Sequence, residues 1–492
     1  MSRPTTLAQL QARYGVRYRW RLLLAVMTGS MAAIMSSTIV NVAIPGMSQH
    51  FALGQDRAQW VTSGFMVAMT VSMLTTPWLL MRYGYRALYS STMLLLMAGG
   101  VLGGLSNHFD LVLLARVMEG LAAGVVQPIP AIIILRAFEP GEQGRANGIF
   151  GMCVVLAPAL GPSIGGVLVD WFGWRSIFFM VVPFCLASLW MSHKYVPVTA
   201  PGGVAANRDS ASLDWRGLLL AACATLGLLN GMVALHNRAH LQASALLGGA
   251  ALALAAFIWW QRELGRRAGH GAANQLGPLM NLTLFKHRQF AMGSIVSFIY
   301  GTALFGSTYL FPVYMQLGLG LSPSFVGTLL LPAGLVLAAT IAIVGPLADK
   351  KPAYLLVSTG LALLALGFAL MVTVDLTTSV WTILVWAIVG RMGLGCILPS
   401  LSLGSMRGLD KHFIAQGAST ISFLRMVGGA TGVSLCAIVL EWRLAAHGES
   451  LAHPSTNPAR LAAFNESFLM LATLCAVAIV AAWQLRPAKH PA

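Results

Sequence analysis

Two ionisable residues, Arg116 and Glu119, lie inside an apolar stretch that is long enough to cross a membrane (LLARVMEGLAAGVVQPIPAIIIL). They are three positions apart, so they share one face of a helix. Ionisable groups at membrane depth are costly and usually mark the path of an ion or a substrate. Burial favours the neutral form of a carboxyl group, whereas a neighbouring guanidinium favours the charged form. A carboxyl group between these opposing influences can change its protonation state when its surroundings change, which is the chemistry of a proton carrier.

The competing interpretation is a static buried ion pair that fixes how the helices pack. Of the 15 acidic residues in the chain, Glu119 is the one that falls deep within a predicted span. The others fall in predicted loops or at predicted helix ends, for example Asp56, Asp110 and Glu441. We therefore predict that Glu119 carries the proton and that Arg116 tunes it.

Two further arginines, Arg391 and Arg425, lie in predicted spans of the second half with no acid predicted nearby. An unpaired arginine within the membrane is expected to face water, a backbone carbonyl or an anionic ligand. Arg425 could instead extend to the membrane surface, and Arg391 could pair with Glu119 across the two halves. The anionic-ligand interpretation favours amphipathic weak acids as substrates. We assign the predicted substrate cavity to these two arginines and to polar residues at membrane depth, namely Ser36, Thr38, Asn41, Gln127 and Gln316.

A second apolar helix is predicted after the polar turn RAFEPGEQGRANG, and it is rich in glycine and proline (APALGPSIGGVLVD). Small residues let helices approach closely, and proline bends a helix. We predict a hinge that prevents leakage while two halves rock, formed by Pro158, Gly161, Pro162, Gly165 and Gly166. Tight packing without motion is the alternative.

The composition shows which solvent surrounds these helices. The chain has 492 residues, of which 57% are hydrophobic and 9% charged, whereas soluble proteins carry roughly 25% charged residues. The solvent must therefore be largely lipid. A net charge of +16 does not predict nucleic-acid binding, because the basic residues separate apolar runs and form no continuous patch. The six cysteines lie within apolar runs without paired or metal-ligand spacing, which is typical of small buried hydrophobes.

Counting apolar runs of roughly 17–25 residues predicts about fourteen membrane spans. An even number places both termini on one side of the membrane. Lysine and arginine concentrate in the connectors on the side of the N-terminus, so the positive-inside rule makes that side cytoplasmic. We predict a multi-pass protein of the inner (cytoplasmic) membrane with both termini in the cytoplasm.

The chain repeats itself weakly at an offset of about 270 residues. The connector 144–148 corresponds to 415–419, and Gly161 corresponds to Gly432. Repeats of this kind underlie many transporters, with the substrate site between the halves near the midplane. We predict a first six-helix bundle in residues 1–192, two inserted spans with cytoplasmic connectors in 193–288, and a second six-helix bundle in 289–492.

These motifs resemble those of the major facilitator superfamily, and within it the fourteen-span drug:proton antiporters of the EmrB/QacA type. Residues 38–45 (TIVNVAIP) resemble that group's first-span signature, and 116–124 (RVMEGLAAG) resemble its fourth-span motif, whose arginine the family links to proton coupling. Residues 157–166 (APALGPSIGG) resemble its antiporter motif. The resemblance covers nearly the whole chain. It implies an all-α integral membrane protein with two six-helix bundles plus two inserted helices, 14 transmembrane helices in all.

The chain departs from the family pattern at three places. Ser36 stands where the first-span signature normally begins with aspartate, and Glu119 stands where the fourth-span motif usually has glutamine. We therefore predict that Glu119 replaces the acid missing at Ser36. The gating motif between spans two and three has Met81 in place of its aspartate, whereas the second copy keeps its acid. The residues predicted to form the cytoplasmic gate are Arg82, Gly84, Arg86, Asp349 and Lys350.

The resemblance implies a proton-coupled antiporter that exports hydrophobic and amphipathic compounds by alternating access. The proton gradient drives it, with no cofactor and no metal. It also implies a periplasmic adaptor protein and an outer-membrane channel as partners if the host is Gram-negative. One alternative is an exporter of a single endogenous metabolite or siderophore. A membrane-embedded acyltransferase is least favoured, because the sequence shows no serine-histidine-acid or metal set, and the lack of a phosphate-binding loop argues against direct use of ATP.

Overall fold

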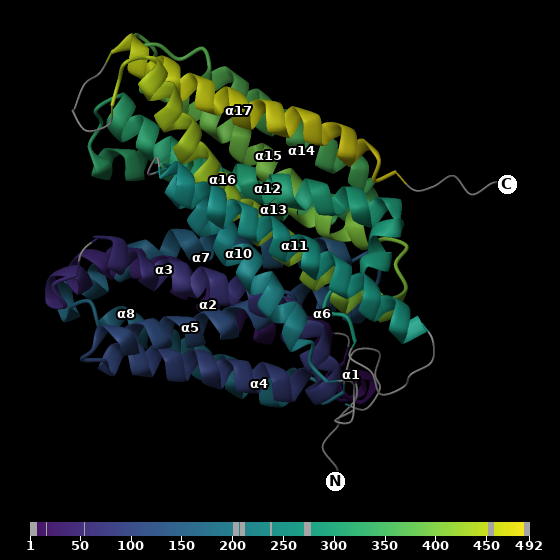
Figure 1. Cartoon of the computed structure of the whole chain (residues 1–492). Coiled ribbons are helices and arrows are strands. Elements are labelled where there is room, and N and C mark those ends of the chain that lie inside the picture. The colour runs from purple at the N-terminus through teal and green to yellow at the C-terminus, as the bar shows by residue number, and fades with distance from the viewer. Residues whose placement is uncertain are drawn as a thin grey trace.

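The computed structural model describes residues 7–15, 17–53, 55–199, 206, 212–236, 239–269, 277–450 and 457–486. Within these ranges every regular element is helical and none is a strand. Twelve candidate spans in the described residues are long and apolar enough to cross a membrane. The chain is therefore an all-helical, multi-pass membrane protein (Figure 1).

The predicted count of fourteen spans remains a prediction. One of the twelve candidates, Trp60–Leu105, has 46 residues, about 69 Å of helix against a hydrocarbon core of roughly 30 Å. It comprises most of α3 (Gln55–Ser72) together with η1 (Met73–Thr75) and α4 (Thr76–Leu105), and the backbone of α4 is not helical at Gly84. In addition, α7 (Gln143–Phe172) has 30 residues but is not among the twelve.

The two halves pair their helices in the same way. In the first half α2 packs on α7, α5 on both α3 and α4, and α4 on α9; in the second half α12 packs on α16, α15 on both α13 and α14, and α14 on α17. The first half also contains α1 (Leu7–Tyr14), α2 (Tyr18–His50), α5 (Phe109–Val126), α6 (Ile129–Ala137), α8 (Ser176–Phe179) and α9 (Val181–Tyr195). The second contains η2 (Leu282–Lys286), α12 (Arg288–Val313), η3 (Tyr314–Gly318), α13 (Pro323–Lys350), α14 (Ala353–Met371), α15 (Val380–Met406), η4 (Lys411–Phe413), α16 (Ile414–Ala446) and α17 (Pro458–Trp483).

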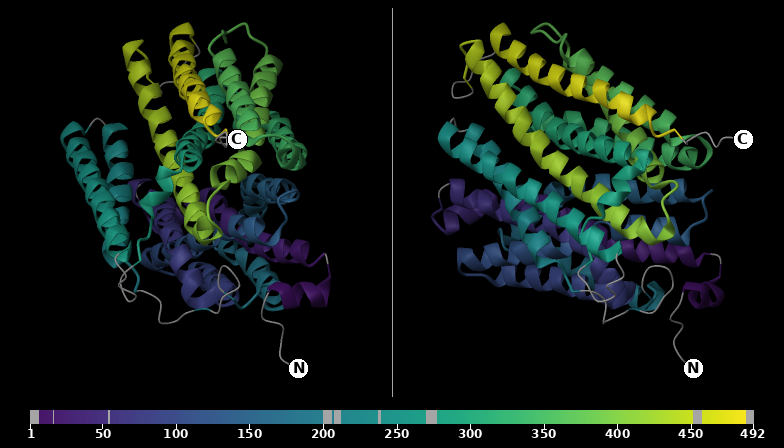
Figure 2. Two further views of the ribbon diagram at one scale, coloured as in Figure 1. Left: turned by 90° about the vertical axis from the view of Figure 1, so that its right-hand side faces the viewer. Right: turned by 45° about the vertical axis from the view of Figure 1, so that its right-hand side comes forward.

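Two more helices, α10 (Trp215–His236) and α11 (His240–Gly269), lie between the halves in the sequence. They pack mainly on each other, and α10 also contacts α16 and α3. Figure 2 shows this pair standing beside the two lobes. The exact boundaries of the three predicted regions stay a prediction.

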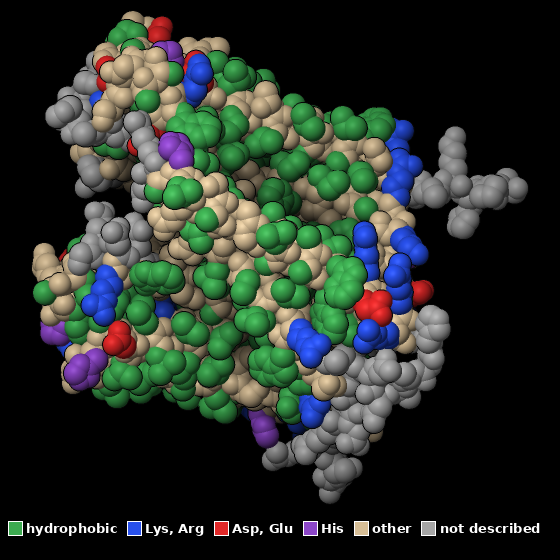
Figure 3. Space-filling model, in the orientation of Figure 1, with side chains coloured by type: hydrophobic (Ala, Val, Ile, Leu, Met, Phe, Trp, Pro, Cys, Tyr) green, Lys and Arg blue, Asp and Glu red, His purple; other side chains and the backbone are tan. Residues whose placement is uncertain are grey.

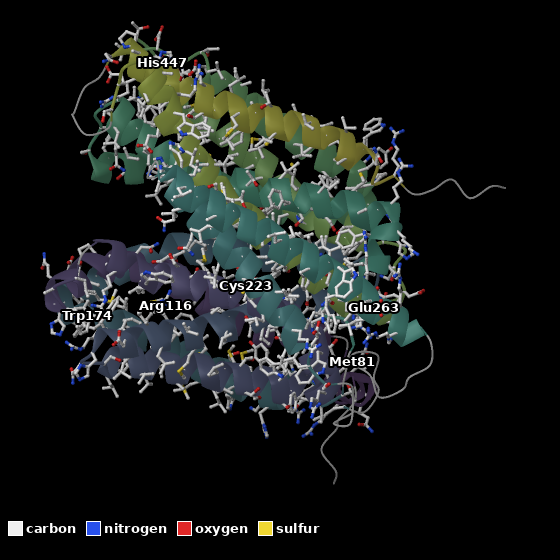
Figure 4. The ribbon with its side chains drawn as sticks, in the orientation of Figure 1. Met81, Arg116, Trp174, Cys223, Glu263 and His447 are labelled. Atoms are coloured by element: carbon white, nitrogen blue, oxygen red, sulfur yellow. The ribbon has the colours of Figure 1, made fainter. Side chains whose placement is uncertain are left out.

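The lobes are joined closely at one end of the bundle. There α7 of the first half packs along α13 of the second, and a methyl group added at Gly148 would lie 2.8 Å from Cα of Gly345. At the opposite end, Trp174 and His447 lie on separate lobes with a gap between them (Figure 4). Basic side chains gather at the closed end (Figure 3). The positive-inside prediction would make this closed end the cytoplasmic one.

Candidate functional site

The centre of the first half contains a buried cluster of Arg116, Glu119 and Ser36. Arg116 Nη1 of α5 donates a hydrogen bond to Glu119 Oε2 over 2.5 Å, and both side chains are only 1% exposed. The hydroxyl of Ser36, on α2, donates to the same carboxylate oxygen over 3.1 Å. Arg116 Nη1 also donates to Ser36 Oγ (3.0 Å) and to the Ser36 carbonyl oxygen (3.2 Å). The three residues therefore form one polar contact between α2 and α5.

Neighbouring helices hold this cluster in place. Arg116 Nε donates to the carbonyl oxygen of Val61 (3.2 Å), and the guanidinium lies 4.2 Å from the ring centroid of Phe65, so α3 contributes a hydrogen bond and a cation–π contact. On α4, a methyl group added at Gly99 would lie 2.8 Å from Glu119 Cγ. Glycine at that position lets α4 approach the carboxyl-bearing side chain. Four helices thus enclose one acid–base pair.

This arrangement is suited to holding or releasing one proton without exposing a charge to lipid. When ionised, the Glu119 carboxylate is compensated by Arg116 and accepts a hydrogen bond from Ser36. In the conformation observed, the side chains of Arg116 and Glu119 are each only 1% exposed. The pair is therefore closed off from water in this state.

A small pocket of about 40 Å³ lies between the two halves. Of the predicted cavity residues, Gln127 and Arg425 line it, whereas Ser36, Thr38, Asn41, Gln316 and Arg391 do not. Thr38 instead donates to its own helix, at the carbonyl oxygen of Met35. Asn41 is exposed and accepts a hydrogen bond from Thr62 of α3. Gln316 lies in the π-helical turn η3, beyond the end of α12, and is half-buried.

The residues that line this pocket and were not predicted from the sequence include Asn147 and Tyr300. The sequence predicts a polar connector at Asn147, but the residue lies inside α7, is 5% exposed and has no hydrogen-bond partner for Nδ2. Tyr300 of α12 is 1% exposed, and its hydroxyl has no hydrogen-bond partner either. The polar turn next to Asn147 hid its depth, and an aromatic residue in an apolar run carries no distinguishing signal.

The predicted arginines of the second half are both half-buried, Arg391 on α15 and Arg425 on α16. Within the described part of the chain neither forms a hydrogen bond or an ion pair through its side chain. The cation paired with Glu119 is Arg116, not Arg391. The Tyr300 hydroxyl lies within electrostatic range of both guanidiniums. These three groups could together offer hydrogen-bond donors to an anion.

The second copy of the gating motif joins the two halves directly. The Asp349 carboxylate of α13 accepts hydrogen bonds from the backbone N–H groups of Gly144 (2.6 Å) and Arg145 (3.0 Å) in the first turn of α7. A carboxylate at a helix N-terminus compensates the unpaired N–H groups and the positive end of the helix dipole. Lys350 follows at the end of α13 and is exposed.

In the first copy, backbone and side-chain hydrogen bonds from Tyr85 and Arg86 reach the segment that follows α9. Gly84 has φ +76°, which favours glycine, and the next two residues donate backbone hydrogen bonds to the carbonyl oxygens of Thr199 and Pro197. Arg86 Nε also donates to the carbonyl oxygen of Val196 over 2.7 Å. The guanidinium of Arg82 lies 5.2 Å from a ring centroid of Trp78. With Met81 in place of the acid, this copy cannot form the bond that Asp349 makes.

The glycine-rich segment of α7 packs against α2. A methyl group added at Gly161 would lie 2.5 Å from Thr38 Oγ1, and one added at Gly165 would lie 2.6 Å from Ile39 Cγ1. Gly166 has nothing within 4 Å, and Pro158 is half-buried. Pro162 belongs to α7, but its side chain lies outside the described residues. Close packing is therefore present, and the hinge motion remains a prediction.

Comparison with known proteins identifies the fold family. Residues 26–433 match the family described as Major Facilitator Superfamily. The chain belongs to the major facilitator superfamily. Among solved structures, this facilitator superposes on the proton:xylose symporter XylE with a TM-score of 0.67 and 12% identity, covering 96% of this chain and 97% of that one.

Relatives of this facilitator include proteins named for multidrug resistance and for riboflavin transport. It is 29% identical to the Multidrug resistance protein B homolog of Mycobacterium tuberculosis, over 86% of this chain and 76% of that protein. It is 24% identical to the Riboflavin transporter RibZ of Clostridioides difficile, over 94% of this chain and 97% of that protein. Membership of this superfamily, with relatives named as transporters, indicates a transporter.

Proposed function

We propose that this facilitator is a proton-coupled antiporter that exports hydrophobic and amphipathic compounds, with a preference for weak acids. The observation that carries the proposal is the contact between Glu119 and Ser36 in the core of the first half. The family resemblance places the coupling acid at position 36, and here a carboxylate from α5 occupies the space beside that position. Glu119 is thus positioned to serve as the proton carrier in place of the missing aspartate.

The proposed cycle couples this pair to the movement of the lobes. The observed state is closed at the end where Asp349 caps α7, and Glu119 is sealed. While the carrier is open at the opposite, outer end, a shift of α2 against α5 lets water from that side reach the carboxyl group. Protonation from the outer side then releases Arg116 from its partner. When the lobes rock and the end at Asp349 opens, the proton passes to the cytoplasm, and the Arg116–Glu119 pair forms again.

The preference for acids rests on Arg391, Arg425 and Tyr300. The two guanidiniums are half-buried and have no carboxylate partner, and the buried Tyr300 hydroxyl has no hydrogen-bond partner. These three groups favour an anionic ligand between them. An amphipathic acid would place its carboxylate there and its apolar part against the surrounding helices. The relative named as a multidrug resistance protein supports export of several compounds.

The finer family assignment is part of the proposal. The 46-residue candidate Trp60–Leu105, broken at Gly84, and the additional 30-residue helix α7 support fourteen spans, and with them the EmrB/QacA type. We further propose an inner-membrane location with both termini in the cytoplasm. A periplasmic adaptor and an outer-membrane channel would complete the export path in a Gram-negative host.

A second candidate is transport of a single metabolite, which the relative named as a riboflavin transporter favours. Purified protein in proteoliposomes with an imposed pH gradient separates the two. A panel of labelled amphipathic acids, matched cations and riboflavin would be compared with and without a protonophore. We expect gradient-dependent transport of several acids. Transport of riboflavin alone would favour the second candidate over the proposal. Transport at the same rate with and without the pH gradient would overturn both proton coupling and proton-driven export.

A further inference from the structure

A cavity of about 1110 Å³ lies at the side of the molecule, between the inserted helices and the second half; we call it the lateral cavity. Its walls come from α10 and α11 on one side and from α12 and α16 on the other, and residues 280–286 close one end. Its volume exceeds the roughly 300–1,000 Å³ typical of pockets for drug-sized ligands. The cavity is separate from the small pocket between the halves.

The walls of the lateral cavity are apolar over most of their extent. The side chains that carry this character include Leu228, Leu247, Phe257, Phe298, Phe423 and Val427. The cavity is partly open to the surroundings of the protein, and Leu254 of α11, which lines it, is 50% exposed. Because α11 is a candidate membrane span, the part of the cavity along this helix lies at membrane depth, where the surroundings are hydrocarbon.

One end of the lateral cavity is cationic. Arg262 and Arg266 lie one turn apart on α11, and Lys286 stands at the end of η2. None of the described residues that line the cavity is acidic. The acid between the two arginines, Glu263, is paired with Arg267 (2.9 Å), and that pair does not line the cavity. Glu263 lies at the end of the bundle where Met81 lies, so the cationic end is at a membrane surface (Figure 4).

Buried hydrogen bonds fix the position of this cationic end. Asp214, 1% exposed, accepts hydrogen bonds from Trp260 Nε1 (2.9 Å) and Gln261 Nε2 (2.7 Å), both on α11. Gln261 Oε1 in turn accepts a hydrogen bond from the backbone N–H of Met280 (3.2 Å). The network ties the end of α11 to the segment that leads to Lys286. The network therefore fixes the relative positions of the two segments that carry these three cations.

We propose that the lateral cavity binds one anionic phospholipid. Its phosphate lies beside Arg262, Arg266 and Lys286, and its acyl chains lie along the apolar walls. A basic pocket between membrane helices at the headgroup level is a recognised way to select anionic lipids. The lipid would fill the space between α11 and the second half, where α11 has its main contacts only with α10 and η2.

Native mass spectrometry of the full chain in mild detergent tests this site, with phosphatidylglycerol and phosphatidylcholine of the same acyl chains as probes. We expect phosphatidylglycerol to bind more tightly, with one tight site. The double variant Arg262→Gln/Lys286→Gln should weaken that binding roughly 30-fold. The control Arg267→Gln/Arg288→Gln removes two cations at the same end of the bundle but outside the cavity, and it should keep the preference.

A second variant tests the apolar part. Ala224→Trp, on α10, fills the cavity without touching its charges, and it should also reduce phosphatidylglycerol binding. Equal binding of the two lipids by the wild type, or equal losses in the cavity variant and the control, would overturn the proposal. Stoichiometric displacement of phosphatidylglycerol by decanoate would also overturn it, because the cavity would then be an entry route for acidic substrates.

Discussion

The hydroxyl oxygen of Ser36 and the carboxylate of Glu119 are 3.1 Å apart, although the two residues belong to different helices. Ser36 is the position at which the family resemblance expects an acid, and Glu119 is a position at which it expects glutamine. The acid therefore stands on α5, beside the position on α2 where the resemblance expects one, and it contacts Arg116. The two departures are 83 positions apart in the sequence, whereas the structure brings them into contact.

Removal of Arg116 should destabilise the protein more than neutralisation of Glu119. Arg116→Ala leaves a buried carboxyl group without its cation and removes the contacts to Val61 and Ser36, and breaking a buried pair in this way costs about 3–5 kcal/mol. Glu119→Gln keeps a polar group of the same shape. Thermal unfolding in detergent should give the order wild type, Glu119→Gln, Arg116→Ala. The reverse order would contradict the larger contribution to stability that we assign to Arg116.

The Asp349 contact should hold the lobes together at the closed end. Asp349→Asn removes the charge that faces the N-terminus of α7, an interaction of roughly 0.3–2 kcal/mol. We expect a larger population of the state that is open at this end, seen as longer distances between spin labels at positions 139 and 410 in a cysteine-free background. Lys350→Gln, at the next position, is the control and should leave the distances unchanged. Unchanged distances in Asp349→Asn would show that the Asp349 contact does not hold the lobes together.

Loss of Arg391 or Arg425 should impair the transport of acidic substrates and leave that of cationic substrates unchanged. Arg391→Ala and Arg425→Ala each remove a charged donor, so we expect the KM for amphipathic acids to rise roughly tenfold or more, while matched cations are transported as before. Arg407→Gln, an exposed arginine at the end of α15, serves as the control. A loss confined to cations would refute the preference for acids.

The glycines of α7 should differ from one another in a predictable way. Gly165→Ala places a methyl group against Ile39, so both stability and transport should fall, whereas Gly166→Ala meets open space and should be neutral. Ile39→Ala in the Gly165→Ala background makes room for the methyl group. If the double variant regains stability but not transport, the glycine contact is needed for motion. If it regains both, packing alone explains the segment.

The sequence allowed the depth of the charged residues within the helices to be predicted, but not that of Asn147 and Gln316, nor the direction in which a side chain points. Charged residues are rare within apolar runs, so their position in a run shows their depth in the membrane. This applies to Arg116, Glu119, Arg391 and Arg425. The sequence could not show that Gln316 lies beyond the end of α12 or that Arg391 does not line the pocket between the halves, since both depend on how helices rotate when they pack. Local patterns also miss contacts between distant helices, such as Ser36 with Glu119 and the lateral cavity.

The central claim is that Glu119 carries the coupled proton. In this role it replaces the acid that the family resemblance expects at position 36. The most direct measurement is the accumulation of a labelled acid in proteoliposomes driven by a pH gradient, for Glu119→Gln and for the double variant Ser36→Asp/Glu119→Gln. We predict that the single variant loses gradient-driven accumulation but keeps downhill exchange, and that the double variant regains accumulation. Accumulation by Glu119→Gln at the wild-type level would contradict the claim.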